Sequence, residues 1–256
     1  MEIRKFKDAF TSFVTIALKP LILILVFSAI ASLKIYYKGM DLSTVYSVIF
    51  LGISILLGIF LVKSKRLKSN SKIIIILLWS FLLRALWLVN IKSVPVSDFN
   101  TMYESAKAVL QGNYDTLWGT GYIARFPHLT MMVMYMTFML KFFKDALLAM
   151  KIVNLVIGVL VVYLIYLILK EIFDKKEVVL IGTLIAAIFP PLITYTGVFC
   201  TENLAIPFYL VSIYIFLLAC KKKVSSWMFI VTGILLSIGN LFRMVAVVTL
   251  IAFVMY

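Results

Sequence analysis

The chain has 256 residues, of which 64% are hydrophobic and only 14% are charged. A soluble domain of this length cannot hide so much apolar surface, so the composition excludes a water-soluble globular protein and indicates an integral membrane protein. The net charge of +14 does not indicate a nucleic-acid partner, because the basic residues lie in clusters between apolar runs, as in cytoplasmic loops that face anionic lipid.

Apolar runs of membrane-spanning length follow one another along the chain. About 20 helical residues are needed to cross the hydrocarbon of a bilayer. Runs of about this length lie at 20–37, 43–62, 73–90, 147–169, 178–198 and 203–219. The tail 226–256 is long enough for two short spans interrupted near Asn240–Arg243. The sequence therefore predicts an all-α polytopic membrane protein with about eight transmembrane helices.

The apolar run Leu129–Leu140 decides the topology. It has only about a dozen residues, so it is short for a span and typical of a re-entrant or interfacial helix. If it does not cross, the lysines at 170–176 and 221–223 face the cytoplasm together with the N-terminal basic cluster, as the positive-inside rule requires. Both termini are then cytoplasmic in a multi-pass protein of the cell membrane, and loop 91–128 is extracytoplasmic.

The polar segment Asp98–Gln111 predicts an amphipathic helix in this outer loop. Its apolar residues recur at steps of three and four, at Phe99, Met102, Tyr103, Ala106, Val109 and Leu110. Ser97 or Asp98 is expected to cap the start of the helix, and Gly112 is expected to end it. An acid fixed at the outer mouth of a span is a candidate catalytic group. The alternative interpretation is that Asp98 is a plain helix cap.

Two arginines occupy unusual positions for a membrane protein. Arg84 lies six residues before the end of its apolar run, where a charge is costly and needs a partner such as Asp98 or Glu202, unless it snorkels to the interface. Arg243 lies in an outer turn between two short spans, against the usual charge bias. Its forked guanidinium suits a phosphate, and the alternative is an isolated interfacial arginine.

The remaining candidates flank a predicted break in a span. Pro190-Pro191 should interrupt the helix, and broken membrane helices tend to line cavities. Glu202 follows at the outer turn, as a site residue or as a charge that favours the N-terminus of the next helix. His128, the single histidine, closes the outer loop as a site residue or as a hydrogen-bonded interface residue.

Taken together, these residues resemble a known family. An apolar span with Arg84 is followed by Pro95-Val96-Ser97-Asp98, with Tyr103 and Ala106 behind it. Pro127, Pro190-Pro191, Thr201-Glu202-Asn203 and Arg243 then follow in order. This order is similar to that of the GT-C fold glycosyltransferases, of the protein-mannosyltransferase and lipid-A aminoarabinose-transferase kind. The resemblance covers roughly 73–256, which we expect to form a GT-C-like core, incomplete at its C-terminus, after a two-span extension at 1–72.

The resemblance implies a sugar transfer on the outer face. The donor is a sugar on a polyprenyl phosphate, and the acceptor belongs to the cell envelope. Asp98 matches the catalytic aspartate of the first outer loop, which acts as general base on the acceptor hydroxyl. Glu202 matches a second acidic position, and Arg243 matches a basic position that holds the carrier phosphate. Arg84, Tyr103 and His128 are further substrate-binding candidates.

The sequence leaves other functions open. A transporter or flippase of lipid-linked sugars also suits broken helices and an intramembrane arginine, but the polar groups gather at one face. A non-catalytic membrane scaffold is the third alternative. No His/Cys ligand spacing indicates a metal, and no cofactor is expected. The chain stops inside the apolar run Ala252–Tyr256, so we expect it to be part of a longer protein that is the active enzyme.

Overall fold

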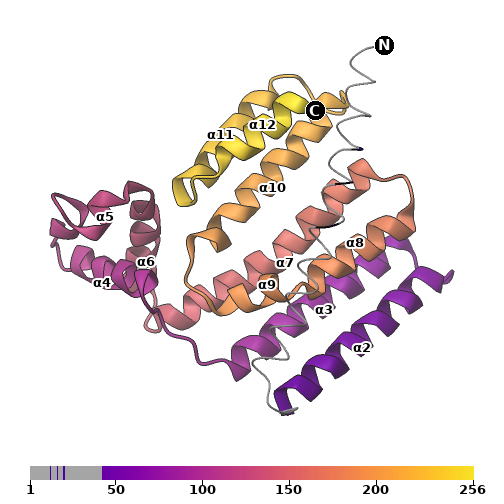
Figure 1. Ribbon diagram of the computed structural model, residues 1–256, viewed down its shortest axis with the longest axis horizontal. Helices are drawn as coiled ribbons and strands as arrows, with labels where there is room; N and C mark the ends of the chain where they lie inside the picture. Colours follow the sequence, from indigo (N-terminus) through magenta and orange to yellow (C-terminus); the bar gives the residue numbers. More distant parts are fainter. Residues whose placement is uncertain (1–11, 13–15, 17–19, 21–41) are drawn as a thin grey trace. The chain divides into compact units, whose positions relative to one another are not determined.

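The structure is a computed structural model that describes residues 42–256 and the isolated positions 12, 16 and 20 (Figure 1). All regular elements within these described residues are helices. The longer ones are α2 (Leu42–Lys63), α3 (Ser69–Asn90), α4 (Asp98–Leu110), α6 (Thr130–Phe142), α7 (Ala146–Ile172), α8 (Lys176–Ile188), α10 (Thr201–Cys220), α11 (Met228–Phe242) and α12 (Ala246–Met255). The short ones are α5 (Tyr122–Arg125), α9 (Pro190–Thr194) and the 3-10 turns η1 (Asp115–Leu117), η2 (Pro127–Leu129) and η3 (Tyr195–Gly197).

The chain divides into two units, 1–53 and 54–256. The first unit contributes only the start of α2 and three isolated positions to the described residues. Apart from its first residue, the apolar run at 20–37 lies outside that described part, and the predicted division after residue 72 stays a prediction. Every contact and site discussed below lies within the second unit.

Within the part of the chain that the structure describes, three helices are long and apolar enough to cross a membrane, namely α3, α7 and α10. The pair formed by α8 and the segment Pro190–Gly197 counts as a fourth candidate if it is one span, bent by 51°. Among the described residues, α11, α12 and the stretch Ile49–Lys63 are shorter apolar helices. The all-helical polytopic architecture is therefore confirmed, whereas the predicted eight spans are not shown.

Both predicted interruptions of the spans are present. Helix α8 ends at Ile188 and α9 begins at Pro190, with Phe189 in an extended conformation between them, because a residue before proline disfavours the helical region. Near the C-terminus, α11 ends at Phe242 and Arg243 is likewise extended before α12 begins. Each break places polar residues beside an irregular backbone.

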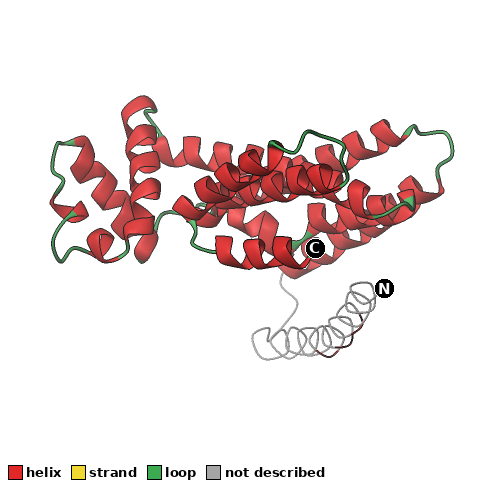
Figure 2. Cartoon of the chain, turned by 90° about the horizontal axis from the view of Figure 1, so that it is seen from above, coloured by secondary structure: helices red, strands yellow, loops and turns green. Residues whose placement is uncertain are grey.

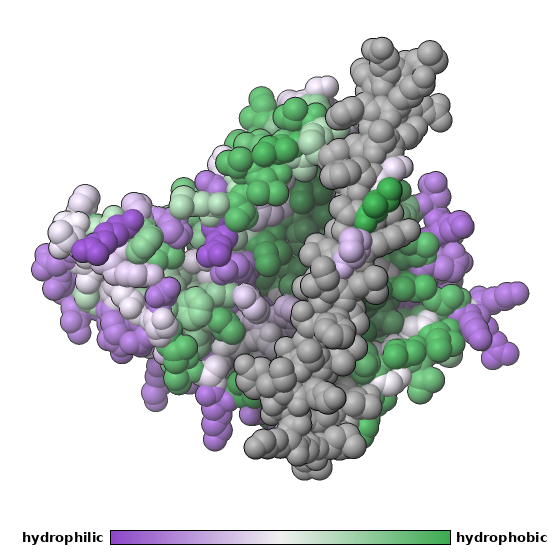
Figure 3. Space-filling view, viewed as in Figure 1, coloured by the Kyte–Doolittle hydropathy of each residue, from purple (hydrophilic) through white to green (hydrophobic). Residues whose placement is uncertain are grey.

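Helices α2, α3, α7 and α8 pack around one apolar cluster. Its buried members are Leu61, Ile73, Ile76, Val162, Leu180, Leu184 and Ala187. The opposite faces of these helices carry exposed Ile, Leu and Phe side chains, as expected for surfaces in contact with lipid. Figure 3 shows hydrophobic side chains over α10–α12 and hydrophilic ones gathered over α4 and α5.

Helices α4, α5 and α6, which we call the outer-loop helices after the predicted topology, form a group of their own at one end of the long helices (Figures 1 and 2). Helix α4 begins at the predicted position, and Gly112, with φ of 83°, follows its last turn as predicted. Helix α6 has 13 residues, so it is about 20 Å long and too short to cross ~30 Å of hydrocarbon. The predicted short apolar helix is therefore present.

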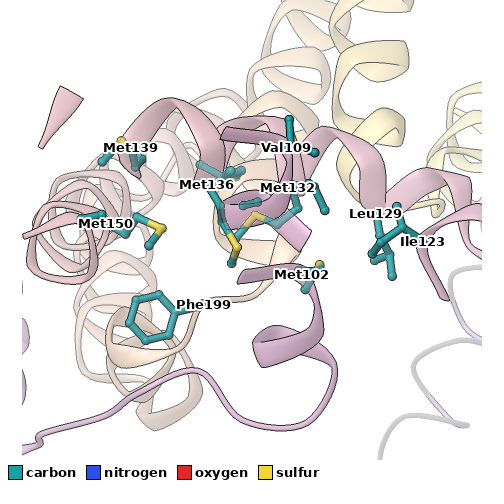
Figure 4. Packing of buried hydrophobic residues seen from close by; sticks show 13 residues of the cluster. Met102, Val109, Ile123, Leu129, Met132, Met136, Met139, Met150 and Phe199 are labelled. Carbon is teal, nitrogen blue, oxygen red and sulfur yellow. The ribbon is translucent and has the colours of Figure 1, made fainter. Parts of the chain in front are cut away.

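A methionine-rich cluster joins these outer-loop helices to the spans (Figure 4). Met102 of α4, Met132 and Met136 of α6 and Met150 of α7 are almost completely buried in it. Phe199, just before α10, belongs to the same cluster. This cluster fixes the position of α4 against the ends of α7 and α10.

Candidate functional site

Arg84 is completely buried in α3, but its hydrogen-bond partners are not carboxylates. Its Nη1 donates to the Ser80 carbonyl at 3.2 Å and to the Ala187 carbonyl of α8 at 3.3 Å. Among the described residues, no ion pair includes Arg84. Nη1 also donates to the Ser80 hydroxyl at 2.5 Å. A serine hydroxyl and two backbone carbonyls therefore take the place of the carboxylate partner expected from the sequence.

The position of Ala187 explains why this arginine lies inside a span. In an uninterrupted helix the carbonyl of residue 187 would accept a hydrogen bond from the amide of residue 191. Pro191 has no amide hydrogen, and Arg84 supplies a donor in its place. Freed backbone groups in a membrane need such internal partners, so Arg84 stabilises the break between α8 and α9.

Glu202 and Arg243 form an ion pair between the start of α10 and the turn after α11. Arg243 Nη2 lies 3.4 Å from Glu202 Oε1, with about half of the arginine side chain and a third of the glutamate side chain exposed (49% and 29%). The Tyr209 hydroxyl donates to the Arg243 carbonyl. The structure thus brings together two of the predicted site residues and leaves both accessible to a ligand.

Asp98 is the first residue of α4 and is exposed. Ser97 before it has φ of 50° and makes no side-chain cap, so the predicted capping hydrogen bond is absent. A serine with positive φ is uncommon, and such strained residues cluster at functional sites. Instead of capping the helix through Ser97, the turn holds Asp98 at a helix N-terminus, which favours a carboxylate.

The pKa of the Tyr122 phenol in α5 is raised by partial burial and by the nearby Asp98 carboxylate. The phenol therefore stays protonated at neutral pH and is able to donate to that carboxylate. The sequence analysis missed this contact. Tyr122 lies in a loop rich in aromatic residues, so nothing in the sequence distinguishes it as a partner of Asp98.

One apolar cluster connects the three charged residues. Phe99, next to Asp98, packs against the methionine-rich cluster, as does Phe242, next to Arg243. Leu204, two residues after Glu202, is buried in it. A residue within two positions of each of Asp98, Glu202 and Arg243 therefore packs in or against this cluster, and Arg84 is not part of it.

The other two candidates are placed in the outer-loop helices. Tyr103 packs against the methionine-rich cluster, and Lys107 lies 4.7 Å from the centroid of its ring. His128 lies in η2 with its ring 6.3 Å from that of Phe126, nearly edge-on. Neither residue contacts the ion pair through an interaction recorded in the described part of the chain.

The backbone before α10 is held by polar side chains, of which the sequence analysis named only Asn203. Asn154 donates to the Thr196 and Val198 carbonyls, at 3.3 and 3.1 Å, and Asn203 donates to the Tyr195 and Val198 carbonyls, both at 2.8 Å. Lys151 donates to the Ser93 carbonyl at 2.6 Å. In the sequence, Lys151 and Asn154 stand out as polar residues inside an apolar run. Within the described residues, no group of three His, Cys, Asp or Glu side chains is placed to hold a metal ion.

The fold and the site define a class: a polytopic helical membrane protein with an acidic outer-loop helix and a carboxylate–guanidinium pair beside a broken span. Residues 128–256 match the family of dolichyl-phosphate-mannose-protein mannosyltransferases. The chain belongs to this family, which confirms the resemblance seen in the sequence. No curated protein and no solved structure matches the chain.

Proposed function

We propose that this chain carries the catalytic acid and the phosphate-binding arginine of a glycosyltransferase that moves a sugar from a polyprenyl phosphate to an envelope acceptor on the outer face. Membership of the family implies a sugar donor on dolichyl or polyprenyl phosphate. The observation that carries the proposal is the partly exposed Glu202–Arg243 pair within the matched region, whose chain neighbours Leu204 and Phe242 belong to the same apolar cluster as Phe99, the neighbour of Asp98.

The proposed chemistry uses one proton transfer and one displacement. Asp98 takes the proton of the acceptor hydroxyl, whose oxygen forms a bond to the anomeric carbon of the sugar. The bond between that carbon and the phosphate oxygen breaks, and polyprenyl phosphate leaves with the bonding electrons. Arg243 stabilises the charge on the leaving phosphate, and Glu202 keeps the guanidinium in place before the donor binds.

The proposed topology places these groups on the extracytoplasmic side. Lys221 and Lys223 contact Glu171 at the opposite ends of α7 and α10 from Lys151 and Glu202. The basic turns after α7 and α10 therefore suit the cytoplasmic face under the positive-inside rule. Both termini are then cytoplasmic.

The test uses membranes from cells that express the protein, so that the native acceptor is present. Transfer of labelled mannose from dolichyl-phosphate-mannose to material insoluble in organic solvent is measured for wild type, Asp98→Asn and Asp115→Asn. We expect Asp98→Asn to lose transfer by a factor of 10² or more, since general-base catalysis contributes about this much. Asp115→Asn, in the same loop, should retain it. Full transfer by Asp98→Asn would remove the catalytic assignment, and acceptor-independent movement of labelled lipid across vesicles would favour a flippase.

A further inference from the structure

The break between α8 and α9 leaves a pocket of about 170 Å³ beside the ion pair. Its walls come from α7, from the segment after the break and from α10. The apolar wall residues are Ile157, Gly158, Val161, Pro191, Leu192 and Ile206. An apolar cavity of about 150 Å³ accommodates a group the size of benzene. This pocket is therefore large enough for the end of a molecule of roughly that width.

The other residues that line the pocket are polar, namely Asn154, Tyr195, Thr196, Glu202 and Asn203. The amide nitrogens of both asparagines already donate to backbone carbonyls. Their remaining hydrogen-bonding atoms are oxygens, which accept. The Glu202 carboxylate also accepts, so these lining residues favour a ligand that donates a hydrogen bond.

Thr196 adds a buried hydroxyl with no partner in the described part of the chain. Its side chain is only 2% exposed, and its Oγ1 makes no hydrogen bond. An unsatisfied buried hydroxyl costs stability unless a ligand pairs with it. A hydroxyl donates and accepts, so it can pair with another hydroxyl in either direction.

The charges around the pocket limit the kinds of ligand that it can bind. Glu202 is paired with Arg243 on the outer side, which weakens the attraction of the pocket for a cation. The carboxylate and the amide oxygens oppose an anion such as a phosphate. The apolar walls oppose a polyol, whose other hydroxyl groups would lose their hydrogen bonds to water.

We propose that this pocket binds the hydroxyl-bearing end of an uncharged, membrane-dissolved alcohol. The apolar body lies against Ile157, Val161 and Ile206, and the hydroxyl pairs with Thr196 and the neighbouring acceptor oxygens. This binding site goes beyond the proposed sugar transfer and does not depend on it.

The test uses photolabelling of the full chain in phosphatidylcholine vesicles with three probes of equal length. They are a dodecanol that carries a diazirine, its methyl ether and its phosphate ester. We expect the alcohol to label peptides of α7 and α10 that line the pocket roughly three- to tenfold more than the ether, the effect of about one net hydrogen bond. Thr196→Val should lower labelling by the alcohol to the level of the ether. Thr194→Val, two residues earlier and outside the pocket, should not.

A second variant tests whether the probes bind in this pocket at all. Ile206→Phe fills the pocket and should lower labelling by the alcohol and the ether alike. Equal labelling by alcohol and ether in the wild type, or labelling by the phosphate ester at least as strong as by the alcohol, would overturn the proposal. So would a Thr196→Val protein that labels like Thr194→Val.

Discussion

Two neighbouring features hold the carboxylate of Asp98 in place. The positive φ of Ser97 sets the direction of the first turn of α4, and the Tyr122 phenol of α5, whose pKa the carboxylate raises, lies near it and is able to donate. A general base must lie within hydrogen-bond reach of the proton that it takes. Tyr122 is therefore a positioning residue for Asp98 in the proposed reaction.

Replacing Tyr122 by Phe removes the hydroxyl that is able to donate to Asp98 and keeps the ring, which packs at a tilt of 52° against Phe126 with centroids 4.9 Å apart. We expect kcat for sugar transfer to fall about three- to tenfold, the effect of one net hydrogen bond, with little change in KM for the donor. Tyr114→Phe, an exposed tyrosine of the same loop, is the control. Equal kinetics for the two variants would show that Tyr122 does not act through Asp98.

At the scale of elements, the contact between α3, α7 and the end of α8 depends on a glycine. A Cβ on Gly158 of α7 would lie 2.5 Å from Arg84 Nε and 3.0 Å from its Cδ. The backbone of α7 therefore approaches the buried guanidinium more closely than any other residue type allows. This packing lets Arg84 reach the Ala187 carbonyl at the break.

Gly158→Ala should therefore destabilise the protein by about 1–3 kcal/mol, the usual cost of overpacking. Gly233 of α11 is a matched control, because a Cβ there meets no atom within 4 Å. Gly233→Ala should leave stability unchanged or raise it, since alanine favours a helix over glycine. Unfolding in mixed micelles with increasing denaturing detergent measures both. A Gly158→Ala protein as stable as wild type would mean that Arg84 moves aside without cost.

The sequence predicted those elements whose formation depends on residues close together in the chain. The run at 73–90, the amphipathic helix after Ser97 and the break at Pro190 follow from periodicity, length and proline chemistry. The partner of Arg84, the Tyr122 contact and the polar lining of the pocket depend on helices distant in sequence. The periodicity of one helix does not show which other helix it contacts, so these contacts could not be predicted from the sequence.

At the scale of the whole molecule, the two cysteines allow the orientation of the chain in the membrane to be tested. Cys200 is buried before α10, and Cys220 is exposed at its other end. Burial and the nearby Glu202 charge raise the pKa of the Cys200 thiol to about 12, so it remains an unreactive thiol at pH 7–9, because the thiolate is the reactive form. The expected topology places Cys220 on the cytoplasmic side.

A membrane-impermeant maleimide should therefore label the protein in inside-out vesicles and not in sealed right-side-out vesicles. Cys220→Ser should abolish labelling, while Cys200→Ser should leave it unchanged. Labelling of Cys220 from the outside would reverse the proposed orientation and place Glu202 and Arg243 on the cytoplasmic side.

The methionines between α4, α6 and α7 have a mechanical consequence. Met102, Met132, Met136 and Met150 lack branches and rotate easily, so they refill space when neighbours shift. The packing between α4, α6 and α7 can therefore adjust to a change of side-chain volume at a neighbouring position without leaving a cavity.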